Sequence, residues 1–129
     1  MTTSKTLSNL SRWPLLLSYT LLLYIAYTLP LAQIPVAVTR ANDKVLHCLN
    51  FLILALLAVR TFTISSYAFF RLQAEGKAMT FSLFYGAFLE WAQKYSDGRE
   101  PSLADWLADA LGVLAAAGIF RISKLTHPS

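Results

Sequence analysis

The sequence predicts an all-α fold, an integral membrane bundle of four transmembrane helices. Four apolar runs, at residues 13–32, 45–64, 78–92 and 103–120, each approach the roughly 20 residues that a helix needs to cross about 30 Å of hydrocarbon. Hydrophobic residues make up 56% of the chain and charged residues 14%, against about 25% charged residues in soluble domains. The 129 residues hold these four spans with short connections and tails, which leaves no separate soluble domain.

The first run resembles a secretory signal peptide in one respect, because two cationic residues precede a leucine-rich segment. The run is long for such a peptide, and Trp13, Tyr24 and Tyr27 suit anchoring at a membrane interface. We therefore interpret it as an uncleaved first span. Pro30 and Pro35 are expected to end this helix and to hold the following segment extended.

The second helix is expected to begin at Asn42 or Asp43, either of which is a natural N-cap. After it, residues 66–72 are amphipathic and predict a short interfacial helix, with Arg71 and Lys77 near lipid headgroups. This short helix would connect the second and third spans.

The fourth helix has a clear predicted start. Asp97 and Gly98 predict a turn, and Ser102 follows as the N-cap, with Asp105 at the N3 position of a motif like a capping box. Small residues recur every four positions along this helix and favour close approach of a neighbouring helix. They are Ala104, Ala108, Gly112 and Ala116.

The distribution of Lys and Arg predicts the orientation of the bundle. Seven of these residues fall in the two tails and the middle connection, and four fall in the first and third connections. Because cytoplasmic loops carry an excess of Lys and Arg, both termini are expected in the cytoplasm. The seven are Lys5, Arg12, Arg60, Arg71, Lys77, Arg121 and Lys124, and the four are Arg40, Lys44, Lys94 and Arg99.

Composition also excludes several classes of protein. The net charge is +4, but Lys and Arg do not cluster as they do in nucleic-acid-binding proteins, so no nucleic acid is expected as a partner. Cys48 is the only cysteine, which excludes an intrachain disulfide and a multi-cysteine metal site. Its place in an apolar run predicts a packing role.

Polar residues gather at one end of three predicted helices. At 100° per residue each set forms a single stripe on its helix, and the stripes are expected to face each other in the bundle. A carboxylate about 10 Å below the boundary, as expected for Glu90 and Asp109, must be paired, protonated or hydrated. The stripes comprise Asp43, His47 and Asn50, then Gly86, Glu90, Gln93 and Asp97, then Asp105, Asp109, Gly112 and Ala116.

Taken in order, these residues resemble the VanZ-like family of small bacterial membrane proteins, over about residues 43–118. The resemblance rests on Asp43-Lys44-x-x-His47-x-x-x-Phe51, Glu90-x-x-Gln93, Gly98-Arg99-x-x-Ser102-x-x-Asp105 and Asp109-x-x-Gly112. It implies an envelope-facing protein with a VanZ-like domain at residues 13–120 and cytoplasmic tails at residues 1–12 and 121–129. The founding member is linked to teicoplanin resistance, but the resemblance implies no particular reaction. The family often has Asn at the position of Asp109, where hydrogen bonding or charge could be the role.

Three functions remain open for this cluster. The leading prediction is an outward-facing polar pocket that binds or senses a cell-envelope component or a glycopeptide-type compound, with membrane lipids as further partners. The second is an intramembrane metal- or carboxylate-dependent enzyme acting on an envelope lipid or cell-wall precursor, with Glu90 or Asp109 as base, His47 as acid or ligand and Arg99 as anion clamp. The third is a small subunit of a transport complex.

A structural network joining three helices is the alternative explanation of the same residues. Arg99 could equally form a salt bridge to Asp97, Glu100 or Asp105, and Ser102 is expected to act as a cap rather than as a nucleophile. The spacing matches no strong metal signature, so no cofactor and no metal ligand is predicted. The candidate pocket residues are Asp43, Lys44, His47, Glu90, Gln93, Arg99, Ser102, Asp105 and Asp109.

Overall fold

The computed structural model describes residues 2–30, 32 and 43–126, with only the backbone described for residues 2–11. Within these residues all regular secondary structure is helical and no strand is present. The predicted all-α fold class is therefore confirmed for the described part of the chain. The helices are α1 (Thr2–Thr28), α3 (Asp43–Thr63), α4 (Ala68–Arg71), α5 (Ala74–Gln93) and α6 (Leu103–Thr126).

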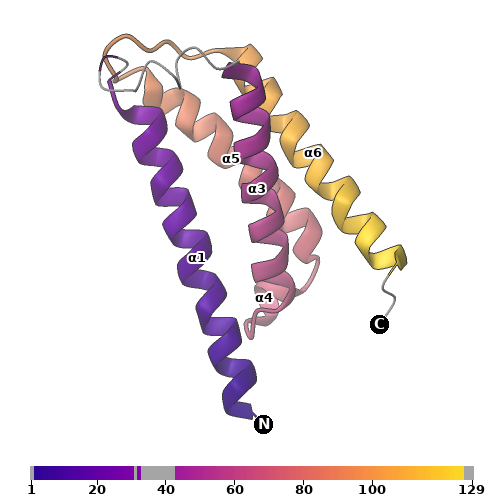
Figure 1. Ribbon diagram of the computed structural model, residues 1–129. Coiled ribbons are helices and arrows are strands. Elements are labelled where there is room, and N and C mark those ends of the chain that lie inside the picture. The colour runs from indigo at the N-terminus through magenta and orange to yellow at the C-terminus, as the bar shows by residue number, and fades with distance from the viewer. Residues whose placement is uncertain (1, 31, 33–42, 127–129) are drawn as a thin grey trace.

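The four long helices alternate in direction, so that α1 and α5 run one way and α3 and α6 the other (Figure 1). The starts of α3 and α6 and the connection after α5 lie at one end of the bundle. The start of α1, the end of α6 and the short helix α4 lie at the other end. This alternation places the predicted polar stripes at a common end.

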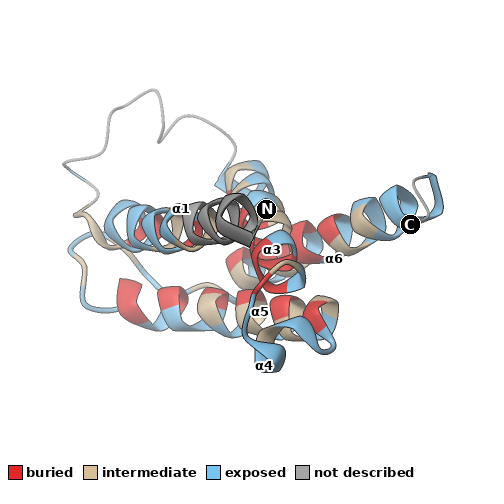
Figure 2. Cartoon of the chain, turned by 90° about the horizontal axis from the view of Figure 1, so that it is seen from below, coloured by how far each residue is buried: buried red, intermediate tan, exposed pale blue. Residues whose placement is uncertain are grey.

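Helix α3 lies at the centre and contacts each of the other helices, with its most extensive contact to α6 (Figure 2). Its central position explains its near-continuous apolar sequence, because several of its faces are covered by neighbours. The side chains that are fully buried along it are Phe51, Leu54, Ala55, Ala58 and Val59.

The closest approach of α3 and α6 is made possible by Gly112. A Cβ atom at this position would lie 2.9 Å from the Leu52 backbone nitrogen and nearer still to the Cys48 carbonyl oxygen. Ala108 and Ala116, one turn to either side, are buried against the same neighbour, whereas Ala104 is exposed. The predicted row of small residues thus forms the helix contact except at Ala104, which lies on the outer face.

Helix α1 begins well before the predicted boundary at Trp13, since residues 2–12 are already helical. Pro14 lies inside this helix and removes one backbone hydrogen bond, which the helix tolerates without a break. The helix ends at Thr28, two residues before Pro30, as predicted. Pro35, Arg40 and the predicted N-cap Asn42 lie outside the described residues.

Hydrogen bonds attach α1 to the rest of the bundle at several heights. The Tyr19 hydroxyl donates to the Asn50 carbonyl at 3.1 Å, and the Tyr85 hydroxyl donates to the Thr20 carbonyl. Near the end of the helix, the Ser96 hydroxyl donates to the Thr28 carbonyl. Tyr19 and Tyr85 therefore join helices rather than acting only as lipid-facing aromatic residues.

The connection between α3 and α5 contains the short helix that the sequence predicted, although it covers only Ala68–Arg71. The Arg71 guanidinium donates to the Ser65 carbonyl at 3.2 Å, and the Lys77 ammonium donates to the Phe69 carbonyl. Both cations are thus tied to the backbone of this connection.

Two of the described helices, α3 and α6, are long and apolar enough to cross a membrane. Large apolar side chains are exposed on all four long helices; exposed residues of every kind are pale blue in Figure 2. Examples are Leu17 and Leu21 on α1, Leu49 and Ile53 on α3, Phe84 and Trp91 on α5, and Leu111, Leu114 and Ile122 on α6.

Candidate functional site

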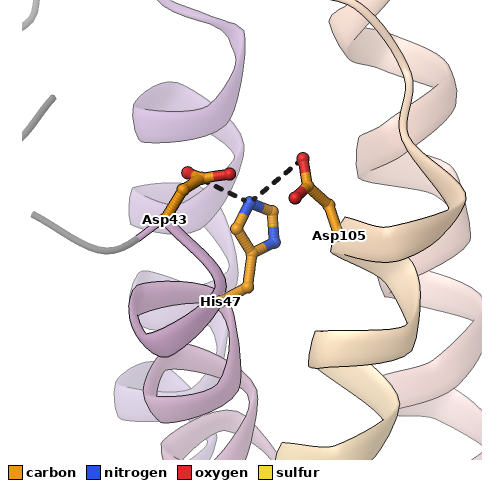
Figure 3. A group of neighbouring side chains, drawn as sticks. All are labelled: Asp43, His47 and Asp105. Atoms are coloured by element: carbon orange, nitrogen blue, oxygen red, sulfur yellow. Dashed lines mark ion pairs between the residues drawn. The ribbon is translucent and has the colours of Figure 1, made fainter.

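His47 is the centre of a polar cluster near the start of α3. It is 2% exposed, and each of its ring nitrogens faces two carboxylates. Nδ1 lies 2.7 Å from Asp109 Oδ1 and 3.9 Å from Glu90 Oε1. Nε2 lies 3.7 Å from Asp43 Oδ1 and 3.8 Å from Asp105 Oδ2 (Figure 3). The predicted convergence of polar stripes from α3, α5 and α6 is therefore present.

Asp109 reaches the imidazole because Gly86 leaves space for it. A Cβ atom at Gly86 would lie 3.1 Å from Asp109 Oδ2 and 3.1 Å from the Phe51 ring. Asp109 itself is 1% exposed, and its short bond to His47 Nδ1 supplies the partner that a buried carboxylate requires. Gly86 thus belongs to the site, although it contributes no functional group.

The N-terminus of α6 is capped by residues from two helices. The Ser102 hydroxyl accepts a hydrogen bond from the Asp105 backbone N–H at 3.2 Å, so Ser102 is the N-cap. In a capping box the N3 side chain would accept from the Ser102 N–H. Here Glu90 on α5 takes that place, with Oε2 2.9 Å from the Ser102 nitrogen.

The reciprocal half of the predicted capping box is therefore wrong for Asp105. Because Glu90 already occupies the Ser102 N–H, the Asp105 carboxylate turns to other partners. It forms an ion pair with Lys44 and faces His47 Nε2. Because Glu90 on α5 accepts the Ser102 N–H in place of Asp105, the cap of α6 also links α5 to α6.

Lys44 bridges the two outermost carboxylates of the cluster. Its ammonium group pairs with Asp105 Oδ1 and lies 3.7 Å from Asp43 Oδ2. The other oxygen of each carboxylate faces His47. Each acid therefore has one oxygen toward the cation at the bundle end and one toward the buried imidazole.

Tyr27 and Asn50 complete the surroundings of His47, and the sequence analysis did not place Tyr27 there. The Tyr27 ring packs on the imidazole with 4.8 Å between centroids, and its hydroxyl accepts a hydrogen bond from Asn50 Nδ2 at 3.0 Å. The sequence favoured a membrane-interface role for Tyr27. Leu16 and Leu23, which are also buried, precede Tyr27 at helical spacing in the same apolar run. This spacing could have predicted that Tyr27 faces the interior of the bundle.

Arg99 is hydrogen-bonded to the end of α1, and its charge acts on Asp43 and Glu90 without an ion pair to either among the described residues. Its Nε donates to the Leu29 carbonyl at 2.9 Å and its Nη2 to the Ala26 carbonyl at 3.1 Å, so it caps the C-terminal end of α1. Burial lowers the pKa of the Arg99 guanidinium from its ordinary value, and the two carbonyls stabilise its charged form.

The predicted salt bridge of Arg99 to a neighbouring acid is therefore wrong, whereas its role as an anion clamp stays a prediction. Among the described residues no ion pair joins it to Asp97, Glu100 or Asp105. The physical reason is the nearby end of α1, whose last carbonyls lack partners within the helix and attract a guanidinium. Gln93 is buried on α5, but none of the hydrogen bonds of the described residues joins its side chain to the cluster.

The cluster has more negative than positive groups. Its carboxylates are Asp43, Glu90, Asp105 and Asp109, and its cationic or basic groups are Lys44 and His47. Such an excess favours binding of protons, a metal ion or another cationic group. Two sets of three side chains bring their ligand atoms within 4.8 Å of one another, namely Asp43, His47 and Asp105, and His47, Glu90 and Asp109.

Comparison with protein-family models, with curated proteins and with solved structures finds no match for this chain. The chemistry of the cluster is therefore argued from its geometry.

Proposed function

We propose that this chain is a VanZ-like, multi-pass protein of the bacterial cytoplasmic membrane, with both termini in the cytoplasm. Its four long helices cross the membrane, and the cluster around His47 binds a component of the cell envelope or a glycopeptide-type compound from the outer side. The observation that carries the proposal is the convergence of four carboxylates on one buried imidazole at a single end of the bundle.

The outer surface of the bundle supports placement in a membrane. Large apolar side chains are exposed on all four long helices, as expected for helices that face lipid. Helices α3 and α6 also have the length and hydropathy of membrane spans. The excess of Lys and Arg in the tails and middle connection favours the cytoplasm for that end.

The VanZ-like resemblance supports the same assignment through the residues that carry it. Asp43, Lys44, His47 and Asp109 all belong to the ordered motif, and all meet in the cluster. Ser102 and Asp105 belong to the motif as well, and they join the cluster through Glu90 and Lys44. The meeting of separated parts of the motif at one point supports the proposal of a binding site.

The topology is tested with single cysteines in a Cys48→Ser background. Asp97→Cys places a thiol in the connection beside the cluster, and Ser66→Cys places one beside α4; both positions are exposed. Asp97 is preferred to Ser96 because the Ser96 hydroxyl bonds the Thr28 carbonyl. An impermeant thiol reagent should label Asp97→Cys in intact cells and Ser66→Cys only after permeabilisation. The reverse pattern would invert the proposed orientation.

Binding is tested with the purified full-length chain in lipid nanodiscs, using teicoplanin and a lipid-linked cell-wall precursor as probes. At least one probe should raise the melting temperature of the wild type, and His47→Gln should remove the shift at unchanged abundance. Asp97→Asn, which alters an exposed acid outside the cluster, is the matched control. No shift in the wild type, or an equal shift in His47→Gln, would contradict the binding proposal.

An intramembrane enzyme is the second candidate, favoured by the 2.7 Å contact between His47 Nδ1 and Asp109. A carboxylate that orients an imidazole in this way is a common arrangement for a general base. Mass spectrometry of the precursor probe after incubation separates the two functions. Conversion by the wild type that is lost in Glu90→Gln, at unchanged abundance and folding, would favour the enzyme.

A further inference from the structure

The two nitrogens of His47 have different surroundings, and this difference points to a ligand. Asp109 is an acceptor when ionised, so its 2.7 Å contact requires the hydrogen of a neutral His47 ring to be on Nδ1. Nε2 then presents a lone pair. Metal-binding histidines typically donate their second ring N–H to a carboxylate in this manner, which fixes the orientation of the ring.

Nε2 of His47 makes no hydrogen bond within the part of the chain that the structure describes. The nearest acidic oxygens, Asp43 Oδ1 and Asp105 Oδ2, lie at 3.7 and 3.8 Å, beyond hydrogen-bonding distance. His47 is nevertheless 2% exposed, and Figure 3 shows Nε2 directed between the two carboxylates. No buried side-chain nitrogen or oxygen of the described residues lacks a partner, so Nε2 keeps some contact with solvent, and its lone pair, aimed between two acids, is free to bind a ligand.

The spacing of these three atoms suits a metal ion. Ligands that each lie about 2.0–2.1 Å from a tetrahedral ion are roughly 3.3 Å apart. The observed separations of 3.7 and 3.8 Å exceed this value by about 0.4 and 0.5 Å, and all three ligand atoms lie within 4.8 Å of one another, so small side-chain rotations would complete the geometry. The other set of potential ligands is less suitable, because His47 Nδ1 is already engaged at 2.7 Å by Asp109.

The charges around Nε2 favour a divalent cation. Among the described residues, the acids Asp43, Glu90, Asp105 and Asp109 outnumber the cations Lys44 and Arg99 whose charges act on them. Asp43 and Asp105 lie in the first turns of α3 and α6, the helix ends at which acidic side chains are favourably placed. Within the described part of the chain, acidic groups thus exceed lysine and arginine side chains around His47.

Lys44 does not occupy the position of the inferred ion. It contacts Asp105 Oδ1 and lies near Asp43 Oδ2, whereas the oxygens that face Nε2 are Asp43 Oδ1 and Asp105 Oδ2. Lys44 thus holds the two acids from the outside. The Asp43 side chain is 64% exposed, so this ligand is in contact with solvent at the bundle end.

We propose that His47 Nε2, Asp43 and Asp105 bind a divalent transition-metal ion, with Asp109 as the carboxylate that positions the imidazole. One imidazole and two carboxylates suit Zn²⁺, Mn²⁺ or Fe²⁺, and three protein ligands leave a coordination position open. The site departs from the sequence prediction of no metal. It rests on the proposed function, because it assumes that the cluster is a binding site. It deepens that function, because an oxygen atom of an envelope ligand would occupy the open coordination position.

The experiment measures Zn²⁺ binding by calorimetry to the purified full-length protein in nanodiscs, after removal of metal with a chelator. The wild type should bind one Zn²⁺ per chain, and Asp43→Asn should weaken binding at least about 100-fold, because an amide replaces a charged ligand. Asp109→Asn should weaken binding about 10- to 100-fold through loss of ring orientation. Asp97→Asn is the matched control and should bind as the wild type does.

Glu90→Gln separates the two possible ligand sets. Glu90 belongs only to the set on the Nδ1 side, so this variant should retain Zn²⁺ binding within about threefold. Co²⁺ substitution gives a second readout, since the intense visible absorption of a tetrahedral site should appear in the wild type and Glu90→Gln and vanish in Asp43→Asn. Absence of saturable binding in the wild type, equal affinity in Asp43→Asn, or loss only in Glu90→Gln would overturn the site.

Failure of this inference can be told apart from failure of the proposed function. Thiol labelling and the shifts with teicoplanin or precursor lipid are measured without added metal. A protein that passes those tests but does not bind Zn²⁺ would have a cluster that recognises its ligand directly. One that binds Zn²⁺ but neither probe would keep the metal site and lose the proposed ligand class.

Discussion

Substitution of Gly112 by Ala tests the idea that close contact between α3 and α6 builds the site. The added Cβ atom would lie 2.9 Å from the Leu52 backbone nitrogen and closer to the Cys48 carbonyl oxygen. Both obstructing atoms belong to the α3 backbone, so no side-chain rotation can relieve the contact. The helices would have to separate.

The magnitude follows from two opposing effects. An ordinary contact begins at about 3.4 Å, so α3 must move away from α6 by at least 0.5 Å at Leu52. Overpacking of this kind costs about 1–3 kcal/mol, and an obstruction by backbone lies at the upper end. Replacement of Gly by Ala inside a helix contributes roughly 0.5–1 kcal/mol in the opposite direction. We expect a net loss of about 2 kcal/mol in the free energy of unfolding.

Gly118 provides a matched control on the same helix, because a Cβ atom there meets no atom within 4 Å. Gly118→Ala should therefore be neutral or stabilising by up to about 1 kcal/mol. The assay is thermal unfolding of both variants in the same detergent, with the amount of protein in the membrane as a second measure.

The separation should also affect the cluster, because Asp109 lies one turn before Gly112 and must reach His47 on α3. Zn²⁺ affinity should fall in Gly112→Ala and stay unchanged in Gly118→Ala. If Gly112→Ala were as stable as Gly118→Ala, the inferred backbone contact between α3 and α6 would be refuted.

Two further predictions concern the helix ends. Arg99→Ala should lower the free energy of unfolding by about 1–2 kcal/mol, because two charge-assisted hydrogen bonds to the end of α1 are lost and one of them is solvent-exposed. Arg99→Lys should recover only part of this loss in the same melting assay, and full stability of Arg99→Ala would contradict the capping role. Ser102→Ala should cost about 1 kcal/mol through loss of the N-cap to Asp105, whereas Ser102→Thr should cost little. Equal melting temperatures for the two Ser102 variants would contradict this cap.

Much of the fold could be predicted from local patterns. The apolar runs and their separation identified the four long helices, and proline and capping residues marked the end of α1 and the start of α6. The early start of α1 was missed because residues 2–12 are polar, and a boundary based on hydropathy stops where the apolar run stops. Helix propensity continues past that point, since backbone hydrogen bonding does not depend on apolar side chains.

The candidate site was predictable in part. His47, Glu90 and Asp109 were recognised because each lies on a polar stripe of a largely apolar helix. Arg99 was included because it is close in sequence to Ser102 and Asp105, but its side chain turns to α1. Tyr27 was missed because a tyrosine near a helix end has the same appearance in sequence whether it faces lipid or a neighbouring helix.

The sequence by itself determined that the polar residues gather at one end. Helical periodicity placed them on one face of each helix, and short connections required successive helices to alternate in direction. Only the tertiary structure decided which acid meets which donor. Glu90 takes the Ser102 N–H across the bundle, and this leaves Asp105 to pair with Lys44 and to face His47. The physical reason is that hydrogen-bond partners are chosen by distance and direction in space, and helix rotation and separation, set by residues such as Gly112 and Gly86, are not encoded in spacing along the chain.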